Sequence, residues 1–279
     1  MIKSIYVTSF IMAANVGLIA ALVMMYQGGW QTPWLGTAIA CGASALFFTH
    51  LILMPRARTS PHLTFMIVAG VLGTAVSVYL GAALTSAPVL IAALVGIVGT
   101  LAYVFWYSKF GRPDNDALAE GNTLPDFEII ENGSVLKSTE LTNKPALWIF
   151  YRGNWCPLCT AQIKEIAGQY RELARRGVEV FLVSPQAEEN SVALSKKMGA
   201  PMRYLTDKNN VVAEKLGILV KGGLPAGFQA LGYDSDVPRP TVFITATGGK
   251  LLHVDMTDNY RVRPEPATFF SVLDRHAIV

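Results

Sequence analysis

The chain has 279 residues, of which 52% are hydrophobic and 15% charged, and its formal net charge at pH 7 is +3. The length allows about two domains, and the composition is too apolar for an ordinary soluble protein. The excess of positive charge is small and forms no basic cluster with interleaved aromatic residues, so nucleic-acid binding is excluded as the main function.

The apolar residues are concentrated in the first part of the chain, where residues 1–112 contain no Asp or Glu. The only Lys and Arg residues there are Lys3, Arg56, Arg58, Lys109 and Arg112. All 20 acidic residues follow, so the second part has the charge balance of a soluble domain. We therefore predict a transmembrane domain over residues 1–110, a polar linker over 111–123 and a soluble domain over 124–279.

Long uncharged stretches in the first part predict membrane spans. Ile5–Tyr26 and Leu35–Met54 each have the length of about 20 residues that crosses a hydrocarbon core of roughly 30 Å. Leu63–Ser108 is too long for one crossing, and Thr85–Pro88 divides it into two. The sequence thus predicts an α-helical bundle of four transmembrane helices in the lipid bilayer. A signal peptide is the alternative for the first stretch, but no small-residue cleavage site follows it.

The five basic residues of this part predict its orientation. With four crossings they would all lie on one side of the membrane, and the positive-inside rule places that side in the cytoplasm. We therefore expect the soluble domain on the cytoplasmic side of a multi-pass cell or inner membrane. No ionisable residue lies in the middle of a span, which argues against an ion pathway. An anchor or partner-docking bundle is the default, and a transporter with a redox-sensing domain is the alternative.

Strands and helices alternate in the second part, which predicts an α/β fold with helices on both faces of a sheet. Phe127–Ile130 and Val135–Lys137 flank an Asn-Gly hairpin signal. Ala146–Tyr151 is a continuous apolar run, typical of a strand that is buried on both faces. Further strands are expected at Val178–Val183, Thr241–Thr245 and Leu251–Asp255. Helices are expected at Pro157 to about Arg176, at about Glu188–Met198 and at Ala267–Arg275, with a helical turn or two at Val211–Leu216.

The most informative motif is Trp155-Cys156-Pro157-Leu158-Cys159, which follows the apolar run and begins a predicted helix. The unpaired N–H groups and the dipole at a helix N-terminus stabilise a thiolate, and thiolates attack disulfides and peroxides. We therefore predict that Cys156 faces water and is the attacking thiolate, with its pKa lowered by the helix and by Arg152 or Arg239. Cys159, one turn further along, is predicted to be more buried and to resolve the intermediate.

Other interpretations of the cysteine pair need features that the sequence lacks. A structural zinc site needs four ligands, and only one such pair exists, so we predict no metal and no other cofactor. A permanent structural disulfide suits an oxidising compartment rather than the cytoplasm. A thioredoxin-like module that only binds its partner stays open, and it would function without Cys156.

Residues 124–275 resemble the peroxiredoxin-like branch of the alkyl hydroperoxide reductase and thiol-specific antioxidant family. The matching segments are Leu124–Phe127, Phe150–Cys159, Val183–Gln186 and Arg239–Ile244. The resemblance implies a thioredoxin fold with a mixed central sheet and antioxidant or disulfide-exchange chemistry. It also implies a cis bond before Pro240, Arg239 beside the reactive sulfur, and a site shaped by Trp155, Pro157, Pro240, Thr241 and Arg152.

The chain departs from this family at two positions before the attacking cysteine. Peroxiredoxins carry a Pro and a Thr or Ser there, whereas this chain has Ile149 and Gly153. The departure favours a membrane-anchored thiol–disulfide oxidoreductase that acts on a protein disulfide and is recharged by a thiol electron donor. The alternative is a thiol-dependent peroxidase that acts on a peroxide with Cys159 resolving.

Overall fold

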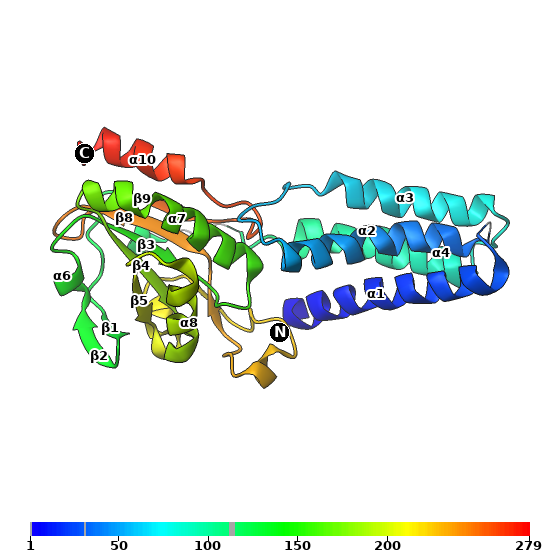
Figure 1. The fold of residues 1–279 in the computed structure, drawn as a ribbon, viewed down its shortest axis with the longest axis horizontal. Coiled ribbons are helices and arrows are strands. Elements are labelled where there is room, and N and C mark those ends of the chain that lie inside the picture. Colours follow the sequence, from blue (N-terminus) through cyan, green and yellow to red (C-terminus); the bar gives the residue numbers. More distant parts are fainter. Residues whose placement is uncertain (1, 31, 112–114) are drawn as a thin grey trace. The chain divides into compact units, whose positions relative to one another are not determined.

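The computed structural model describes residues 2–30, 32–111 and 115–279 and divides into two units (Figure 1). The first unit comprises Met1–Pro55 and Thr59–Lys109, and the second comprises Arg56–Arg58 and Phe110–Val279. Gln31 in the predicted turn after the first span, and residues 112–114 in the predicted linker, including Arg112, lie outside the described residues.

The first unit consists of apolar helices. They are α1 (Ile2–Gly28), α2 (Trp34–Leu53), α3 (Thr64–Tyr79) and one continuous helix made of α4 (Ala87–Ile91), η1 (Ala92–Gly99), α5 (Thr100–Ala102) and η2 (Tyr103–Tyr107). Three of these, α1, α2 and the continuous helix Ala87–Tyr107, are long and apolar enough to cross a membrane.

The prediction of four spans is therefore wrong in its count. Helix α3 has 16 residues, which at 1.5 Å per residue gives about 24 Å, short of a hydrocarbon core of roughly 30 Å. The helix ends at Tyr79 because Gly81 takes the left-handed φ of +92° and turns the chain out of helical geometry. The apolar residues that follow lie in a turn and add no length to α3.

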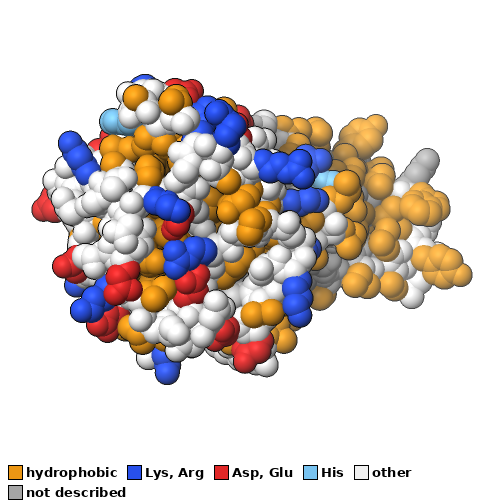
Figure 2. Space-filling view, turned by 60° about the vertical axis from the view of Figure 1, so that its left-hand side comes forward, with side chains coloured by type: hydrophobic (Ala, Val, Ile, Leu, Met, Phe, Trp, Pro, Cys, Tyr) orange, Lys and Arg blue, Asp and Glu red, His pale blue; other side chains and the backbone are white. Residues whose placement is uncertain are grey.

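Glycines permit close packing between the helices of the first unit. A Cβ atom on Gly36 would lie 2.0 Å from the carbonyl oxygen of Gly73, and one on Gly70 would lie 2.3 Å from the carbonyl oxygen of Gly96. Small residues let helix backbones approach in this way where no charged group holds them together. Figure 2 shows hydrophobic side chains over the visible face of this unit and mixed charges over the second.

The second unit is built on a seven-stranded sheet in the order β2-β1-β5-β4-β3-β8-β9. Strand β3 pairs in parallel with β4, and β4 with β5, while the other neighbours are antiparallel. The predicted mixed sheet is confirmed. The strands are β1 (Glu128–Glu131), β2 (Ser134–Lys137), β3 (Ala146–Phe150), β4 (Glu179–Ser184), β5 (Arg203–Thr206), β8 (Thr241–Thr245) and β9 (Leu251–Met256), with β6 (Leu219–Val220) and β7 (Val237–Pro238) paired outside the sheet.

Helices cover this sheet, and α10 lies along α7 (Figure 1). Helix α7 buries Ile163, Ile166 and Leu173, spaced at three and seven residues as one face of a helix requires. The helices are α6 (Ser138–Leu141), α7 (Pro157–Arg175), α8 (Glu188–Met198), α9 (Val211–Lys215) and α10 (Pro266–Arg275), with short 3-10 turns η3 (Asp116–Leu118), η4 (Lys208–Asn210) and η5 (Phe228–Leu231).

The central strand β3 is buried along its whole length. Its Trp148 and Phe150 pack in one core cluster with Phe181 and Phe243, and the alternate residues point to the opposite face of the sheet. Leu118 of the predicted linker also packs in this cluster. The described end of the predicted linker is therefore part of the folded unit.

Candidate active site around the cysteine pair

The two cysteines lie where the central strand passes into the longest helix of the second unit. Strand β3 ends at Phe150, Cys156 is the N-cap of α7, and Pro157 occupies the first turn, where its missing N–H is not needed. The N–H of Cys159 donates to the carbonyl oxygen of Cys156 at 3.0 Å. The predicted position of the pair between a buried strand and a helix N-terminus is confirmed.

The two sulfurs are close together and sealed from water. Their Sγ atoms are 2.6 Å apart, and the exposed fraction is 2% for Cys156 and 0% for Cys159. The prediction that Cys156 faces water is wrong. The loop before it is tied to residues 221–236, because Arg152 donates to the carbonyl oxygen of Gly223 and the Trp155 ring packs on Phe228 at 5.5 Å.

Arg263 is the cation nearest to the sulfurs in the described structure, and we did not predict it. Its Nη2 lies 3.3 Å from Cys159 Sγ and 3.8 Å from Cys156 Sγ. The side chain is 3% exposed, and its other donors bind the carbonyl oxygen of Tyr260 at 3.1 Å and Oε1 of Gln162 on α7 at 2.9 Å. Arg263 follows Cys159 by 104 residues, in an irregular segment after β9, so no local spacing reveals the contact.

The electrostatics of the pair differ from the prediction. Burial and the bond to Cys159 raise the pKa of Cys156 well above its usual value, although the charges of Arg263 and Arg152 oppose that rise. Burial also disfavours the thiolate of Cys159, but the hydrogen bond from Cys156 and the charge of Arg263 outweigh it and lower the pKa of Cys159 to about 5. The negative charge of the reduced pair therefore rests on the sulfur nearer Arg263, with the proton on Cys156.

Of the two predicted arginines, the structure brings one to the site. Arg152 is 5% exposed, and its guanidinium lies 4.7 Å from the Trp155 ring centroid and lowers the pKa values of both cysteines. Arg239 does not lie beside the sulfurs as the resemblance implied. It donates to the carbonyl oxygens of Phe110 at 3.2 Å and Gly111 at 2.8 Å, because these acceptors lie within reach of its buried guanidinium.

The segment before β8 also differs from the expectation. No peptide bond among the described residues is cis, so the bond before Pro240 is trans. The chain arrives there extended, since Val237 and Pro238 pair with β6 and the Arg239 N–H donates to Ile218, and a trans bond continues that direction. Thr241 is buried and donates to the carbonyl oxygen of Arg239 rather than to a sulfur.

A buried glutamine supports the loop that precedes Cys156. Gln186 comes from the Val183–Gln186 segment and accepts from the N–H of Asn154 at 2.9 Å. Its amide donates to the Tyr151 hydroxyl at 2.9 Å and to Ser191 at 3.1 Å. The resemblance included this segment without giving Gln186 a role, and its role is to hold the cysteine loop in place.

Gly153 is required by the same loop. Its φ is +134°, and a Cβ atom there would lie 2.8 Å from Nε1 of Trp155. Trp155 Nε1 in turn donates to the carbonyl oxygen of Arg152 at 3.1 Å. A Thr or Ser at this position would therefore collide with the indole, which explains the departure from the family pattern in physical terms.

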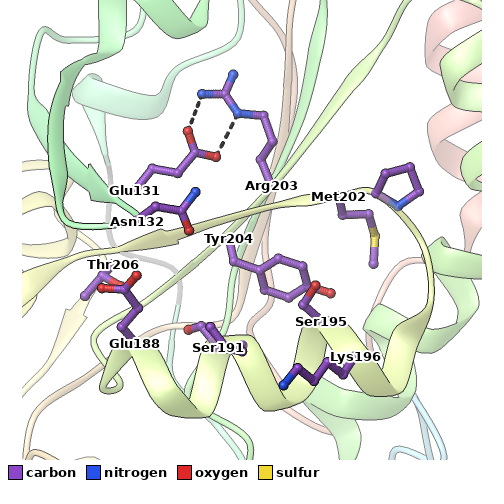
Figure 3. A pocket seen from close by; sticks show the side chains of 12 residues that line it. Glu131, Asn132, Glu188, Ser191, Ser195, Lys196, Met202, Arg203, Tyr204 and Thr206 are labelled. Carbon is purple, nitrogen blue, oxygen red and sulfur yellow. Dashed lines mark hydrogen bonds and ion pairs between the residues drawn. The ribbon is translucent and has the colours of Figure 1, made fainter.

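A separate hollow of about 440 Å³ lies between β5 and α8, and neither cysteine lines it. Figure 3 shows that Arg203 is held there by Glu131, through bonds of 2.9 and 2.6 Å. Arg203 also pairs with Glu179 at 3.1 Å, so its charge is already balanced by the protein.

Residues 121–254 match the AhpC/TSA family. Peroxiredoxin Q of Sedum lineare is 28% identical over 102 residues, which are 36% of this chain and 55% of that protein. Peroxiredoxin Q of Gentiana triflora is 26% identical over 102 residues, which are 36% of this chain and 47% of that protein. The chain thus spans about half the length of these curated relatives.

Two solved structures show the same kind of likeness. Peroxidoxin BcpB from Mycobacterium tuberculosis aligns with a TM-score of 0.46 and 19% identity, over 57% of this chain and 97% of that one. AhpC of Enterococcus faecalis aligns with a TM-score of 0.46 and 16% identity, over 57% of this chain and 93% of that one.

The mixed sheet and the cysteine pair at the start of α7 lie in the part of the chain that matches this family. By this match, residues 121–254 are similar to the AhpC/TSA family and to the peroxiredoxins compared above. The resemblance stated from the sequence is confirmed.

Proposed function

We propose that the protein is a membrane-anchored thiol–disulfide oxidoreductase that uses Cys156 and Cys159 as a dithiol. The observation that carries this proposal is the pair of sulfurs 2.6 Å apart, with the Arg263 guanidinium against both. Two sulfurs at this separation close into a disulfide with little movement of the backbone. Residues 1–110 serve as the anchor, and residues 124–279 form the catalytic domain.

The reaction exchanges one disulfide for another. The Cys156 thiolate attacks a substrate disulfide, forms a mixed disulfide and releases the first substrate thiolate. Cys159 then attacks Cys156 Sγ as a thiolate, releases the second substrate thiolate and leaves Cys156 and Cys159 oxidised. An external thiol donor returns two electrons and two protons to the pair.

The resting charge on Cys159 is compatible with attack by Cys156. The two Sγ atoms are 2.6 Å apart, so the shared proton is within reach of either sulfur. Cys156 is the N-cap and retains the small exposed fraction of the pair, whereas Cys159 lies inside the helix with none. The external disulfide therefore meets Cys156 first, once the loop contact between Arg152 and Gly223 opens.

Thiol-dependent peroxide reduction is the second candidate, and the AhpC/TSA match favours it. Cys156 would then attack a peroxide oxygen, release the alcohol or water, and become a sulfenic acid that Cys159 resolves with loss of water. Ile149 and Gly153 at the positions of the family's Pro and Thr or Ser argue for slow peroxide turnover.

One pair of rates separates the two candidates. Reduced full-length protein in detergent is mixed with hydrogen peroxide, and separately with the disulfide-bonded protein insulin, while oxidation of the cysteines is followed over time. We expect rapid exchange with insulin and peroxide oxidation no faster than that of an ordinary free thiol. A peroxide rate constant far above that of a free thiol would reverse the preference.

The substrate is found with a trapping variant. Cys159→Ser keeps the attacking sulfur but cannot resolve the mixed disulfide, so mass spectrometry should find a partner protein attached to Cys156. Cys156→Ser is the matched control and should trap none. Equal trapping by both variants would show that Cys156 is not the attacking sulfur.

The anchor is proposed to place the redoxin domain on the cytoplasmic side. Within the first unit, Lys3 Nζ donates to the carbonyl oxygen of Lys109 at 2.5 Å, so the helical region begins and ends at the same end of the unit. The shorter helix α3 is therefore proposed to return the chain between the two membrane faces together with the three long helices. The positive-inside rule assigns that end to the cytoplasm. A reporter that fluoresces only in the cytoplasm, fused after Val279, should be bright, and a dark fusion with intact expression would contradict this orientation.

A further inference from the structure

Arg58 is contributed by the connection between α2 and α3, yet it belongs to the redoxin unit. Its guanidinium makes a two-pronged ion pair with Glu165 on α7, with N–O distances of 3.2 and 2.7 Å. The same group donates to the carbonyl oxygens of Arg263 and Pro264, both at 3.1 Å. Four bonds from one side chain therefore join the Arg263 segment to the helix that carries the cysteines.

The position of these bonds connects Arg58 to the sulfurs. Glu165 lies one turn along α7 from Gln162, which accepts the other prong of Arg263 at 2.9 Å. Arg263 is thus held to α7 twice, directly through Gln162 and through its own backbone by Arg58. Its Nη2 then points at Cys159 Sγ at 3.3 Å.

We propose that Arg58 is a positioning residue for the redox centre: it holds the backbone at Arg263 and Pro264 against α7, so that the Arg263 guanidinium stays beside the two sulfurs. An exposed ion pair contributes little by itself, and the Arg58 and Glu165 side chains are 27% and 37% exposed. The backbone carbonyl bonds give the contact its effect on the site. Loss of these carbonyl bonds would consequently change sulfur reactivity.

This inference rests on the proposed dithiol function, but its test needs no turnover. The ultraviolet absorbance of the thiolate is titrated against pH in the reduced full-length protein in detergent. The other groups that face the sulfurs, Arg263, Arg152 and Tyr151, stay unchanged in every variant. If the protein does not reduce insulin but the Arg58 variant has a shifted thiolate titration, the proposed function fails and the inference stands. If the protein reduces insulin but the titration of the Arg58 variant is unshifted, the inference fails and the function stands.

Arg58→Ala should raise the midpoint of the thiolate titration by about half a pH unit to one pH unit. This is part of the roughly 1–3 units by which a neighbouring cation lowers a pKa, because Arg263 itself remains in the variant. The rise corresponds to about 3–10-fold less thiolate at a pH below the midpoint. Arg58→Lys should give a smaller rise, because an ammonium keeps the charge but loses the planar fork. Arg175→Ala is the control, since it removes a two-pronged bond to Glu172 at the far end of the same helix.

A charge swap separates positioning from a simple ion pair. Arg58→Glu combined with Glu165→Arg restores opposite charges but leaves a carboxylate that cannot donate to the Arg263 and Pro264 carbonyl oxygens. The midpoint should therefore stay raised in the double variant, and recovery of the wild-type midpoint would reduce Arg58 to an ion-pair partner. An Arg58→Ala midpoint that equals that of Arg175→Ala would overturn the proposal. If Arg58→Ala does not fold, the Arg58→Lys and Glu165→Gln variants replace it. A thiolate midpoint equal to that of the wild type in both would also overturn the proposal.

Discussion

The two units of the molecule bury different chemistry. The first unit carries only Lys3 and Lys109 as charged residues, neither of them buried, and its helices meet through glycines. Among its described residues, the second buries four arginines, Arg152, Arg239, Arg261 and Arg263, with exposed fractions of 5, 7, 0 and 3%. A charge-free interior is stabilised by close approach and by neutral contacts such as the hydrogen bond from Thr37 to the carbonyl oxygen of Pro88, whereas a buried guanidinium must find acceptors to offset its lost hydration.

The acceptors that the arginines find decide what each one does. Arg239 is satisfied by two backbone carbonyl oxygens, so it is structural. Arg263 has a carbonyl oxygen, an amide oxygen and the two sulfurs. One of its acceptors is therefore a group that changes charge in the proposed reaction. The thiolate stabilises the buried arginine, the arginine stabilises the thiolate, and oxidation of the pair removes that attraction.

Removal of the Arg263 charge should have the largest effect. Arg263→Met leaves a side chain of similar length without a cation, so the thiolate midpoint should rise by about 1–3 units. Loss of the stabilised reduced form should also make the reduction potential more negative by about 30–90 mV, as equilibration with glutathione would show. Arg239→Met removes another buried arginine and should change neither value. Equal shifts in both variants would mean that the effect is general damage to the fold.

The titration of the pair should also proceed in two widely separated steps. The lowered pKa of Cys159, to about 5, means that one thiolate is present above pH 5 and is lost as the pH falls through that value. The raised pKa of Cys156 means that its proton leaves only above the ordinary range of a free cysteine. Absorbance should therefore stay at one thiolate equivalent from about pH 6 to pH 8, a range that ends just below the ordinary cysteine pKa of about 8.5. Two equivalents that appear together near that value would contradict the charge sharing.

In the first unit, the contrast predicts sensitivity to volume rather than to charge. Gly36→Ala puts a Cβ atom 2.0 Å from the carbonyl oxygen of Gly73, which cannot move aside as a side chain can. The helical unit should lose about 3 kcal/mol of unfolding free energy, at the upper end of the usual cost of overpacking. Gly42→Ala meets only Leu18 at 3.6 Å and serves as the control. Unfolding in detergent measures both, and equal stability of the two variants would refute the packing account.

Hydropathy and periodicity predicted most elements of both units. Helix α8 was predicted at about Glu188–Met198 and strand β8 at Thr241–Thr245, and the structure has both elements at these positions. These segments combine an unambiguous local pattern with breakers at their ends. Strand β5 was missed, because Arg203–Thr206 has four residues, one of them charged, and its partner strands supply what its own pattern lacks.

The site was predictable only as far as its residues are local in sequence. The motif Trp155–Cys159 predicted the pair, because a strand, a loop and a helix N-terminus follow one another directly. Arg263 contacts the sulfurs although it lies 104 residues after Cys159. Arg58 contacts the Arg263 segment although it comes from the connection between two apolar helices. The burial of Cys156 likewise depends on a distant segment, through Arg152 and Gly223. No period or spacing in one sequence records such contacts.

Within the second unit, two glycines should respond to substitution in opposite directions. Gly153→Thr forces a β-branched residue into φ +134° and against Trp155, so unfolding free energy should fall by about 2 kcal/mol. Gly168→Ala lies in the middle of α7 with no atom within 4 Å of the new Cβ, so it should add about 0.5–1 kcal/mol. Denaturant unfolding compares the two. Because the structure requires glycine at 153, the Thr that peroxiredoxins use there should not raise peroxide turnover. A Gly153→Thr variant that is stable and reacts faster with peroxide would contradict this, and would show that the loop adopts the peroxidase arrangement.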